Sequence, residues 1–79
     1  MIAIIKRKIN NKRYEFKVET RYFGIEFSPY ENGEMLVLFQ MFEEADKIPE
    51  TEKDLLAYGE LLLRDLKELV PFLSKYTER

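Results

Sequence analysis

The sequence predicts an α+β protein, in which an antiparallel β-meander of three or four strands packs on one long C-terminal α-helix. Three observations predict this fold. Two β-rich runs flank an Asn-Asn pair near the N-terminus, an almost entirely apolar run fills residues 35–42, and leucines recur at helical spacing after residue 54. A chain of 79 residues allows one domain, so we expect residues 1–79 to fold as a single unit.

The first two strands are expected at residues 2–9 and 13–19, joined as a hairpin because asparagine tolerates a positive φ. A two-residue turn at Asn10-Asn11 sets four pairs of residues opposite each other: Ala3 and Val18, Ile5 and Phe16, Ile4 and Lys17, and Lys6 and Glu15. The first two pairs are apolar and share one face, while the charged pair lies on the other face. This agreement between the faces supports the register.

A further strand is expected near Gly24. Apolar residues fall on even numbers from Tyr14 to Val18 but on odd numbers from Phe23 to Phe27. Such a change of phase requires a bulge or a break, and glycine tolerates both. This part of the chain therefore forms either one long bent strand or two shorter strands.

The residues "SPYENGE", 28–34, are expected to form a loop. A tight turn at Asn32-Gly33 would place Glu31 opposite Glu34, and like charges directly opposite each other are unfavourable. We therefore expect a wider loop before the next strand.

The strand expected at residues 35–42 carries more apolar surface than one core needs. Alternate side chains point to opposite faces, so one set can meet the helix: Met35, Val37, Phe39 and Met41. The opposite set joins two residues of the first strand in a second apolar patch: Ile2, Ile4, Leu36, Leu38 and Phe42. Exposed patches of this kind usually mark an interface, and we expect a homodimer. The alternative is that the C-terminal residues Phe72, Leu73 and Tyr76 cover the patch.

The helix is expected to begin after Thr51, which can cap it in a variant of the capping box with Asp54. One stripe at helical spacing faces the sheet: Leu55, Tyr58, Gly59, Leu62, Leu66, Leu69 and Leu73. A second stripe widens the apolar face beyond what one sheet requires, so we assign its residues Leu56 and Leu63 to the interface. Pro71 should end or kink the helix near Val70.

Charge is distributed unevenly along the chain, although the net charge is only −2. Residues 1–22 carry seven basic and two acidic side chains, whereas residues 23–54 carry two basic and nine acidic ones. Two interpretations are open. The asymmetry marks an interaction surface, or the two segments are neighbours in the fold and their charges cancel locally.

Composition argues against several function classes. The chain has no cysteine and no histidine, so disulfides, thiolate metal sites and the usual neutral-pH acid–base groups are absent. Its three glycines form no phosphate-binding loop, and the acidic run 43–54 lacks the glycine of a calcium loop. We therefore expect no enzyme, no cofactor and no metal. The sequence contains no membrane-spanning run and no secretory signal, so we expect a cytoplasmic protein without a membrane partner.

The most specific functional signal is the basic hairpin. We predict that five cations contact nucleic acid: Lys6, Lys8, Arg13, Lys17 and Arg21. Basic side chains on a two-stranded ribbon can match phosphates, and Tyr14, Tyr22 and Tyr30 can offer stacking platforms for unpaired bases. The alternative, which a sequence pI of about 5.2 favours, is a protein–protein interaction or inhibitor module that uses the exposed apolar sheet face and the acidic 43–54 segment.

The expected order of strands followed by a single dimer-forming helix is similar to that of small coactivator-type domains that bind single-stranded DNA. The similarity is one of element order. It implies an arrangement of elements and transfers no functional residue.

Overall fold

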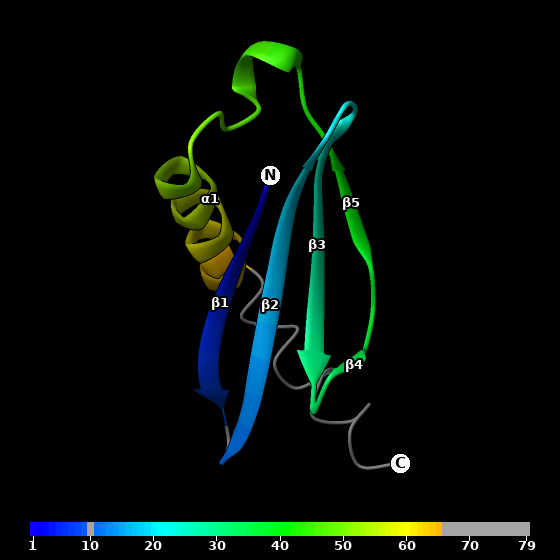
Figure 1. The fold of residues 1–79 in the computed structure, drawn as a ribbon, viewed down its shortest axis with the longest axis vertical. Helices are drawn as coiled ribbons and strands as arrows, with labels where there is room; N and C mark the ends of the chain where they lie inside the picture. Colours follow the sequence, from blue (N-terminus) through cyan, green and yellow to red (C-terminus); the bar gives the residue numbers. More distant parts are fainter. Residues whose placement is uncertain (10, 66–79) are drawn as a thin grey trace.

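The computed structural model describes residues 1–9 and 11–65 and has an α+β fold (Figure 1). In chain order the elements are β1 (Ile2–Ile9), β2 (Lys12–Arg21), β3 (Gly24–Glu31), β4 (Glu34–Met35), β5 (Phe39–Phe42), a short 3-10 helix η1 (Ala45–Lys47) and α1 (Glu52–Asp65). One antiparallel sheet contains all five strands, and α1 packs against β1 and β2. The predicted fold class is confirmed.

The order of the strands gives the sheet two different edges. β1, β2 and β3 are successive neighbours, and both β4 and β5 pair with the other side of β3. β1 is therefore one edge strand, and β4 with β5 forms the other edge. In Figure 1, α1 lies beside the β1 edge. We call the face of the sheet that α1 covers the inner face, and the opposite face the outer face.

The β1–β2 hairpin has the register that the sequence predicts. Ile5 lies opposite Phe16 and Lys6 lies opposite Glu15, and the other two predicted pairs are also present. Ile5 and Phe16 are buried, whereas Lys6 and Glu15 are exposed, so the predicted faces are correct as well. Asn11 in the turn has a φ of 65°, within the left-handed region that asparagine tolerates.

The change of phase between the second and third apolar runs is a break between two strands. The two-residue connection Tyr22-Phe23 joins β2 to β3 and sets Arg21 opposite Gly24. Gly24 is also where the end of β5 comes close, because a Cβ at this position would lie 2.1 Å from the carbonyl oxygen of Met41. Glycine is needed here because any side chain would collide with the backbone of β5.

The connection from β3 to β4 shows that the prediction of a wide loop is wrong. β3 continues to Glu31, and Asn32 and Gly33 form a tight turn with φ values of 52° and 82°. Positive φ at both central residues suits the twist of an antiparallel hairpin. Glu31 and Glu34 do lie opposite each other, but Glu34 is exposed and its charge is screened by water. The turn preference of Asn-Gly outweighs the charge repulsion.

The predicted strand at residues 35–42 is interrupted opposite Pro29. β4 ends at Met35 and β5 begins at Phe39, so three intervening residues face two residues of β3. Pro29 has no N–H to donate, and its carbonyl oxygen accepts the N–H of Leu36 at 2.8 Å. The extra residue shifts the phase, so Leu36 packs against the core and Met35 is exposed, the opposite of the prediction for both.

The hydrophobic core lies on the inner face. It consists of eight buried apolar side chains: Ala3, Ile5, Tyr14, Phe16, Val18, Ile25, Phe27 and Leu55. Phe27 is at the centre of an aromatic row, with its ring centroid 5.8 Å from that of Phe16 and 6.3 Å from that of Phe39. Ring pairs at these separations add to the stabilisation that burial provides.

The helix α1 begins as the sequence predicts. Thr51 Oγ1 accepts a hydrogen bond from the backbone N–H of Asp54 at 3.1 Å. Gly59 brings the helix close to the sheet, since a Cβ there would lie 2.6 Å from Ile5 Cδ1 and 2.7 Å from Val18 Cγ2. The rest of the predicted helix and its C-terminal turn lies outside the described residues: Leu66, Leu69, Val70, Pro71, Phe72, Leu73 and Tyr76.

Tyr58 connects α1 to the end of β5. Its hydroxyl donates a hydrogen bond to Glu43 Oε1 at 3.1 Å. Burial, followed by the hydrogen bond and the charge of Glu43, raises the pKa of Tyr58 to about 12. The neutral phenol is therefore the form that the folded state favours.

We expect the folded state to lose stability in alkali as Tyr58 ionises. Because the folded-state pKa is raised above the ordinary value of 10.0, this stabilisation is fully present below pH 10 and disappears as the pH rises toward about 12. Urea unfolding measured at several pH values across this window should show the decline. Tyr58→Phe cannot ionise and should show a shallower decline, whereas an identical pH profile would contradict the assignment.

Candidate functional site

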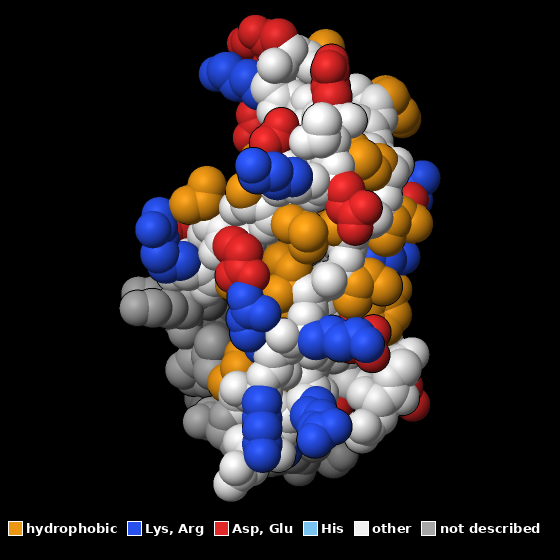
Figure 2. Space-filling view, turned by 60° about the vertical axis from the view of Figure 1, so that its left-hand side comes forward, with side chains coloured by type: hydrophobic (Ala, Val, Ile, Leu, Met, Phe, Trp, Pro, Cys, Tyr) orange, Lys and Arg blue, Asp and Glu red, His pale blue; other side chains and the backbone are white. Residues whose placement is uncertain are grey.

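Basic side chains gather on the outer face near the end of the β1–β2 hairpin. Lys6, Lys8 and Arg13 share this face because alternate residues of paired strands point the same way. They line an open hollow of about 550 Å³, together with Arg7, Tyr14, Glu15, Tyr30 and the Asn32-Gly33 turn. Figure 2 shows Lys and Arg side chains side by side at the lower end of the molecule, where the hairpin ends in Figure 1. We call this site the basic hollow.

Four cations line the basic hollow. Arg7 pairs with Glu60 of α1, whereas Lys6, Lys8 and Arg13 have no ion-pair partner among the described residues. Lys6 lies opposite Glu15 without forming an ion pair with it. Glu15 is the one acidic residue in the lining, so positive charge is in excess around the hollow and produces a local field that attracts anions.

Lys8 and Arg13 lie directly opposite each other across the hairpin. The N–H of Thr20 bonds to the carbonyl oxygen of Met1 at 3.0 Å, so odd-numbered residues of β1 direct their backbone groups toward β2. Lys8 and Arg13 are therefore a non-hydrogen-bonded pair, the kind in which facing side chains come closer together. Two like charges in this position repel each other, and a bound anion would relieve the repulsion.

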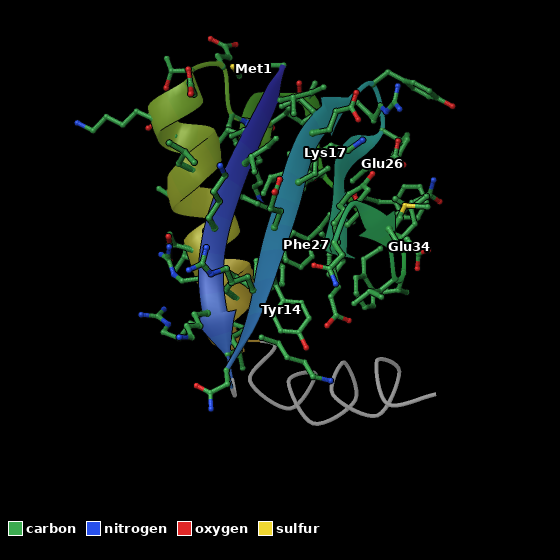
Figure 3. All side chains as sticks on the ribbon, turned by 60° about the horizontal axis from the view of Figure 1, so that its bottom comes forward. Met1, Tyr14, Lys17, Glu26, Phe27 and Glu34 are labelled. Atoms are coloured by element: carbon green, nitrogen blue, oxygen red, sulfur yellow. The ribbon has the colours of Figure 1, made fainter. Side chains whose placement is uncertain are left out.

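The other two predicted nucleic-acid contacts lie outside the basic hollow. Lys17 Nζ is 5.7 Å from the ring centroid of Tyr30 and 3.9 Å from Glu19 Oε2. Arg21 lies at the opposite end of β2, where it pairs with Glu19 at 3.5 Å and bonds to Glu26. Figure 3 shows Lys17 and Glu26 at a distance from Tyr14, which is nearer the hairpin end. Arg21 is therefore held in an ion-pair network away from Lys6, Lys8 and Arg13.

The three tyrosines have three different environments. Tyr14 is only 2% exposed and belongs to the core, so its ring is not available for stacking on a base. Tyr22 is 94% exposed but lies in the β2–β3 connection, at the far end of the strands. Tyr30 lines the basic hollow and is the tyrosine whose position suits a stacking role.

The predicted apolar patch is not contiguous. Ile2 and Ile4 lie on β1, whereas Leu38 and Phe42 lie at the β5 edge, three strand spacings away. These groups are on the order of 14 Å apart, and polar residues of β2 and β3 lie between them. The other predicted interface residues are partly buried against the core: Leu36, Leu56 and Leu63. Strand order, which the sequence did not reveal, separates the two groups.

The acidic segment 43–54 lies at the far end of the molecule from the basic hollow. η1 and the beginning of α1 are at the top of Figure 1, and the hairpin end is at the bottom. Figure 2 shows Asp and Glu side chains gathered at the top. The charges of residues 1–22 and 23–54 are therefore cancelled locally only in part, where Arg21 of β2 pairs with Glu26 of β3. The basic hollow and the acidic segment 43–54 lie too far apart to neutralise each other.

Sequence reasoning missed how two parts of the site are positioned. Tyr30 was predicted to be a stacking platform, but it and the Asn32-Gly33 turn were expected in a loop. The Asn-Gly dipeptide was the signal that could have placed them beside the hairpin. Arg7 forms an ion pair with Glu60 of α1. No pattern in the sequence relates these two residues, which are 53 positions apart.

Comparison with protein-family models, with curated proteins and with solved structures found no match. Within residues 1–9 and 11–65, no helix is long and apolar enough to cross a membrane. The same residues contain no group of three or more metal-ligating side chains placed to hold an ion. The basic hollow is therefore the feature from which a function can be argued.

Proposed function

We propose that this protein is a small binding or regulatory protein whose β1–β2 hairpin contacts the phosphate backbone of a nucleic acid. The contacts are made by Lys6, Lys8 and Arg13. The observation that carries the proposal is the convergence of these three cations on one hollow without an ion-pair partner in the described chain.

Phosphate oxygens suit the side chains of the basic hollow. The guanidinium group of Arg13 can donate two parallel hydrogen bonds to one phosphate, and the ammonium groups of Lys6 and Lys8 act as point charges on its neighbours. A phosphate between Lys8 and Arg13 also removes their mutual repulsion. Each of these effects favours binding of an anion over the empty site.

A polymer of phosphates and bases fits the hollow better than a single small anion. The hollow is open, so a chain can enter and leave it, and the Tyr30 ring stands in its lining. Stacking of a base on an aromatic ring contributes about 1–3 kcal/mol and is tolerant of sequence. Phosphate contacts by the cations and stacking on Tyr30 together favour single-stranded nucleic acid.

The test is the salt dependence of binding to a labelled single-stranded oligonucleotide and to a duplex, measured by fluorescence anisotropy. Three phosphate contacts should give a slope of log K against log salt of about −2.1 for the single strand and about −2.7 for the duplex. Lys8→Gln combined with Arg13→Gln should weaken binding at least about tenfold and bring the slope toward zero by about 1.4 for the single strand and about 1.8 for the duplex.

The matched control is Arg21→Gln, which removes a positive charge from the same strand but from the opposite end of the sheet. Circular dichroism should show that all variants remain folded. A control as damaging as either single change, Lys8→Gln or Arg13→Gln, would mean that net charge rather than the basic hollow governs binding. If the protein binds neither oligonucleotide at low salt, the proposal of nucleic-acid binding is wrong.

A second candidate function is contact with a basic protein surface through the acidic segment 43–54. The observation that favours it is the separation of this segment from the basic hollow, which leaves its charge available at one end of the molecule. If neither oligonucleotide binds, contact with a basic protein surface becomes the preferred proposal.

A further inference from the structure

Among residues 1–9 and 11–65, no strand pairs with the side of β5 that faces away from β3, and exposed apolar side chains lie along this edge. In Figure 1 no labelled element lies beyond β5, in contrast to the β1 edge, where α1 lies. Phe42 is 76% exposed and Leu38, just before the strand, is 44% exposed. Both belong to the sequence "LFQMF" at residues 38–42. Open apolar edges of this kind are templates for pairing with another strand.

The backbone groups of this edge can be assigned from the hydrogen bonds on its other side. The N–H of Glu43 bonds to the carbonyl oxygen of Phe23 at 3.0 Å, and Met41 lies opposite Ile25 in the same ladder. Odd-numbered residues of this strand therefore bond to β3. The N–H and carbonyl groups of Gln40 and Phe42 consequently point away from β3, to the open edge.

The side chains of this edge are complementary to themselves about Gln40. In an antiparallel pair with a second copy centred on Gln40, Leu38 meets Phe42 on the outer face and Phe39 meets Met41 on the inner face. The two Gln40 side chains lie opposite each other, and amide groups can both donate and accept hydrogen bonds. Each apolar residue thus meets an apolar residue, and each amide meets an amide.

We infer that the protein forms a two-fold homodimer in which β5 pairs with β5 of a second copy, with the two Gln40 residues opposite each other on the symmetry axis. The dimer covers Leu38 and Phe42, two of the apolar residues that the described part of the chain leaves exposed at this edge. Closed two-fold dimers are the most common assemblies of identical chains, because one self-complementary patch completes them.

Other alignments of the two strands are less favourable. A slip of two residues in either direction places Gln40 opposite Leu38 or Phe42, so an amide loses its partner and faces an apolar side chain. A slip of one residue sets outer-face residues of one copy opposite inner-face residues of the other, so the outer faces of the two copies would point in opposite directions. Two apolar residues stand on each side of Gln40, and this symmetric pattern favours a second copy of this chain over an unrelated strand as the partner.

A two-fold axis through this strand pair is perpendicular to the sheet, so both outer faces point the same way. The basic hollows of the two copies then lie on one face of a continuous sheet. The dimer does not depend on the proposed nucleic-acid function, because the basic hollow and the β5 edge share no residue.

A charge exchange at position 40 tests both the interface and its register. The full chain and its variants are measured by light scattering after size-exclusion chromatography over a wide range of concentrations. Gln40→Lys places like charges opposite each other on the axis, as does Gln40→Glu, so each variant alone should dimerise at least about tenfold more weakly than the unchanged chain. An equimolar mixture of the two should dimerise again. Ile4→Lys is the matched control, because its outward-facing side chain lies on the β1 edge.

Four outcomes are decisive. A concentration-dependent dimer that is weakened by both Gln40 variants and restored in their mixture confirms the inference. A monomer at all concentrations up to about 1 mM overturns it, because contacts weaker than about 4 kcal/mol do not define an assembly. A dimer that only Ile4→Lys disrupts places the interface at the other edge and also overturns it. Weakening in both variants without restoration in the mixture rejects the register.

Discussion

Phe27→Ala should remove about 3–5 kcal/mol from the free energy of unfolding. Phe27 is 1% exposed, and its ring stands between those of Phe16 and Phe39, so truncation leaves a cavity that two neighbouring rings cannot fill without moving. A chain of 79 residues has a total stability of roughly 4–12 kcal/mol. Urea unfolding followed by circular dichroism should therefore show a transition midpoint lowered by at least about a quarter, and no folded baseline if the total stability is at the lower end of this range.

Phe42→Ala is the matched control for Phe27→Ala. It removes the same atoms from a side chain that is 76% exposed on a neighbouring strand. The Phe42 ring contacts that of Phe23 at a centroid distance of 5.4 Å, so the substitution should cost no more than about 1.5 kcal/mol. Both variants are compared at low protein concentration, so that association does not contribute to the measured stability. If Phe27→Ala and Phe42→Ala lower the free energy of unfolding equally, the core does not lie on the inner face.

Gly24→Ala should destabilise the fold by about 3 kcal/mol or more. The added Cβ would lie 2.1 Å from the carbonyl oxygen of Met41 and 2.8 Å from the backbone nitrogen of Glu43. Both of these atoms belong to backbone that cannot rotate away, so β5 must separate from β3. Hydrogen exchange should show this directly, as lost protection of the N–H groups of Phe39 and Met41.

Gly33→Ala separates the effect of space from the effect of backbone conformation. Gly33 has a φ of 82°, but no atom lies within 4 Å of the Cβ position. Alanine there should cost about 1–2 kcal/mol through its conformation alone, with the protection of β5 retained. If the two glycine variants lose the same stability, the close contact between Gly24 and β5 is not what requires glycine.

Local pairs of residues made much of the fold predictable from the sequence. The register of the β1–β2 hairpin followed from Ile5 and Phe16 on one face and Lys6 and Glu15 on the other. The length of a short turn determines which residues of the two strands lie opposite each other. The Thr51 cap of α1 was predictable for the same reason, since its partner is three residues away. Lys6, Lys8 and Arg13 were placed on one face by this register.

What depends on non-local contacts was not predictable. The bulge opposite Pro29 depends on which strand lies beside β3, and it reversed the expected faces of Met35 and Leu36. The same strand order put Ile4 and Phe42 on different edges of the sheet. At Asn32-Gly33 the preference of Asn-Gly for a tight turn opposed the repulsion between Glu31 and Glu34. The sequence alone did not show that the turn preference is the stronger effect.

Arg7 has a consequence for how far these molecules can associate. Its guanidinium group donates a hydrogen bond to the carbonyl oxygen of Lys6 at 2.9 Å and also pairs with Glu60 of α1. The carbonyl of an even-numbered β1 residue points away from β2, so this side chain occupies an acceptor that an incoming strand would need. One sheet edge is thus obstructed while the other can pair once. In the dimer that we infer, growth by successive strand addition would therefore stop after two chains, without the open-ended fibrils that a sheet with two available edges would form.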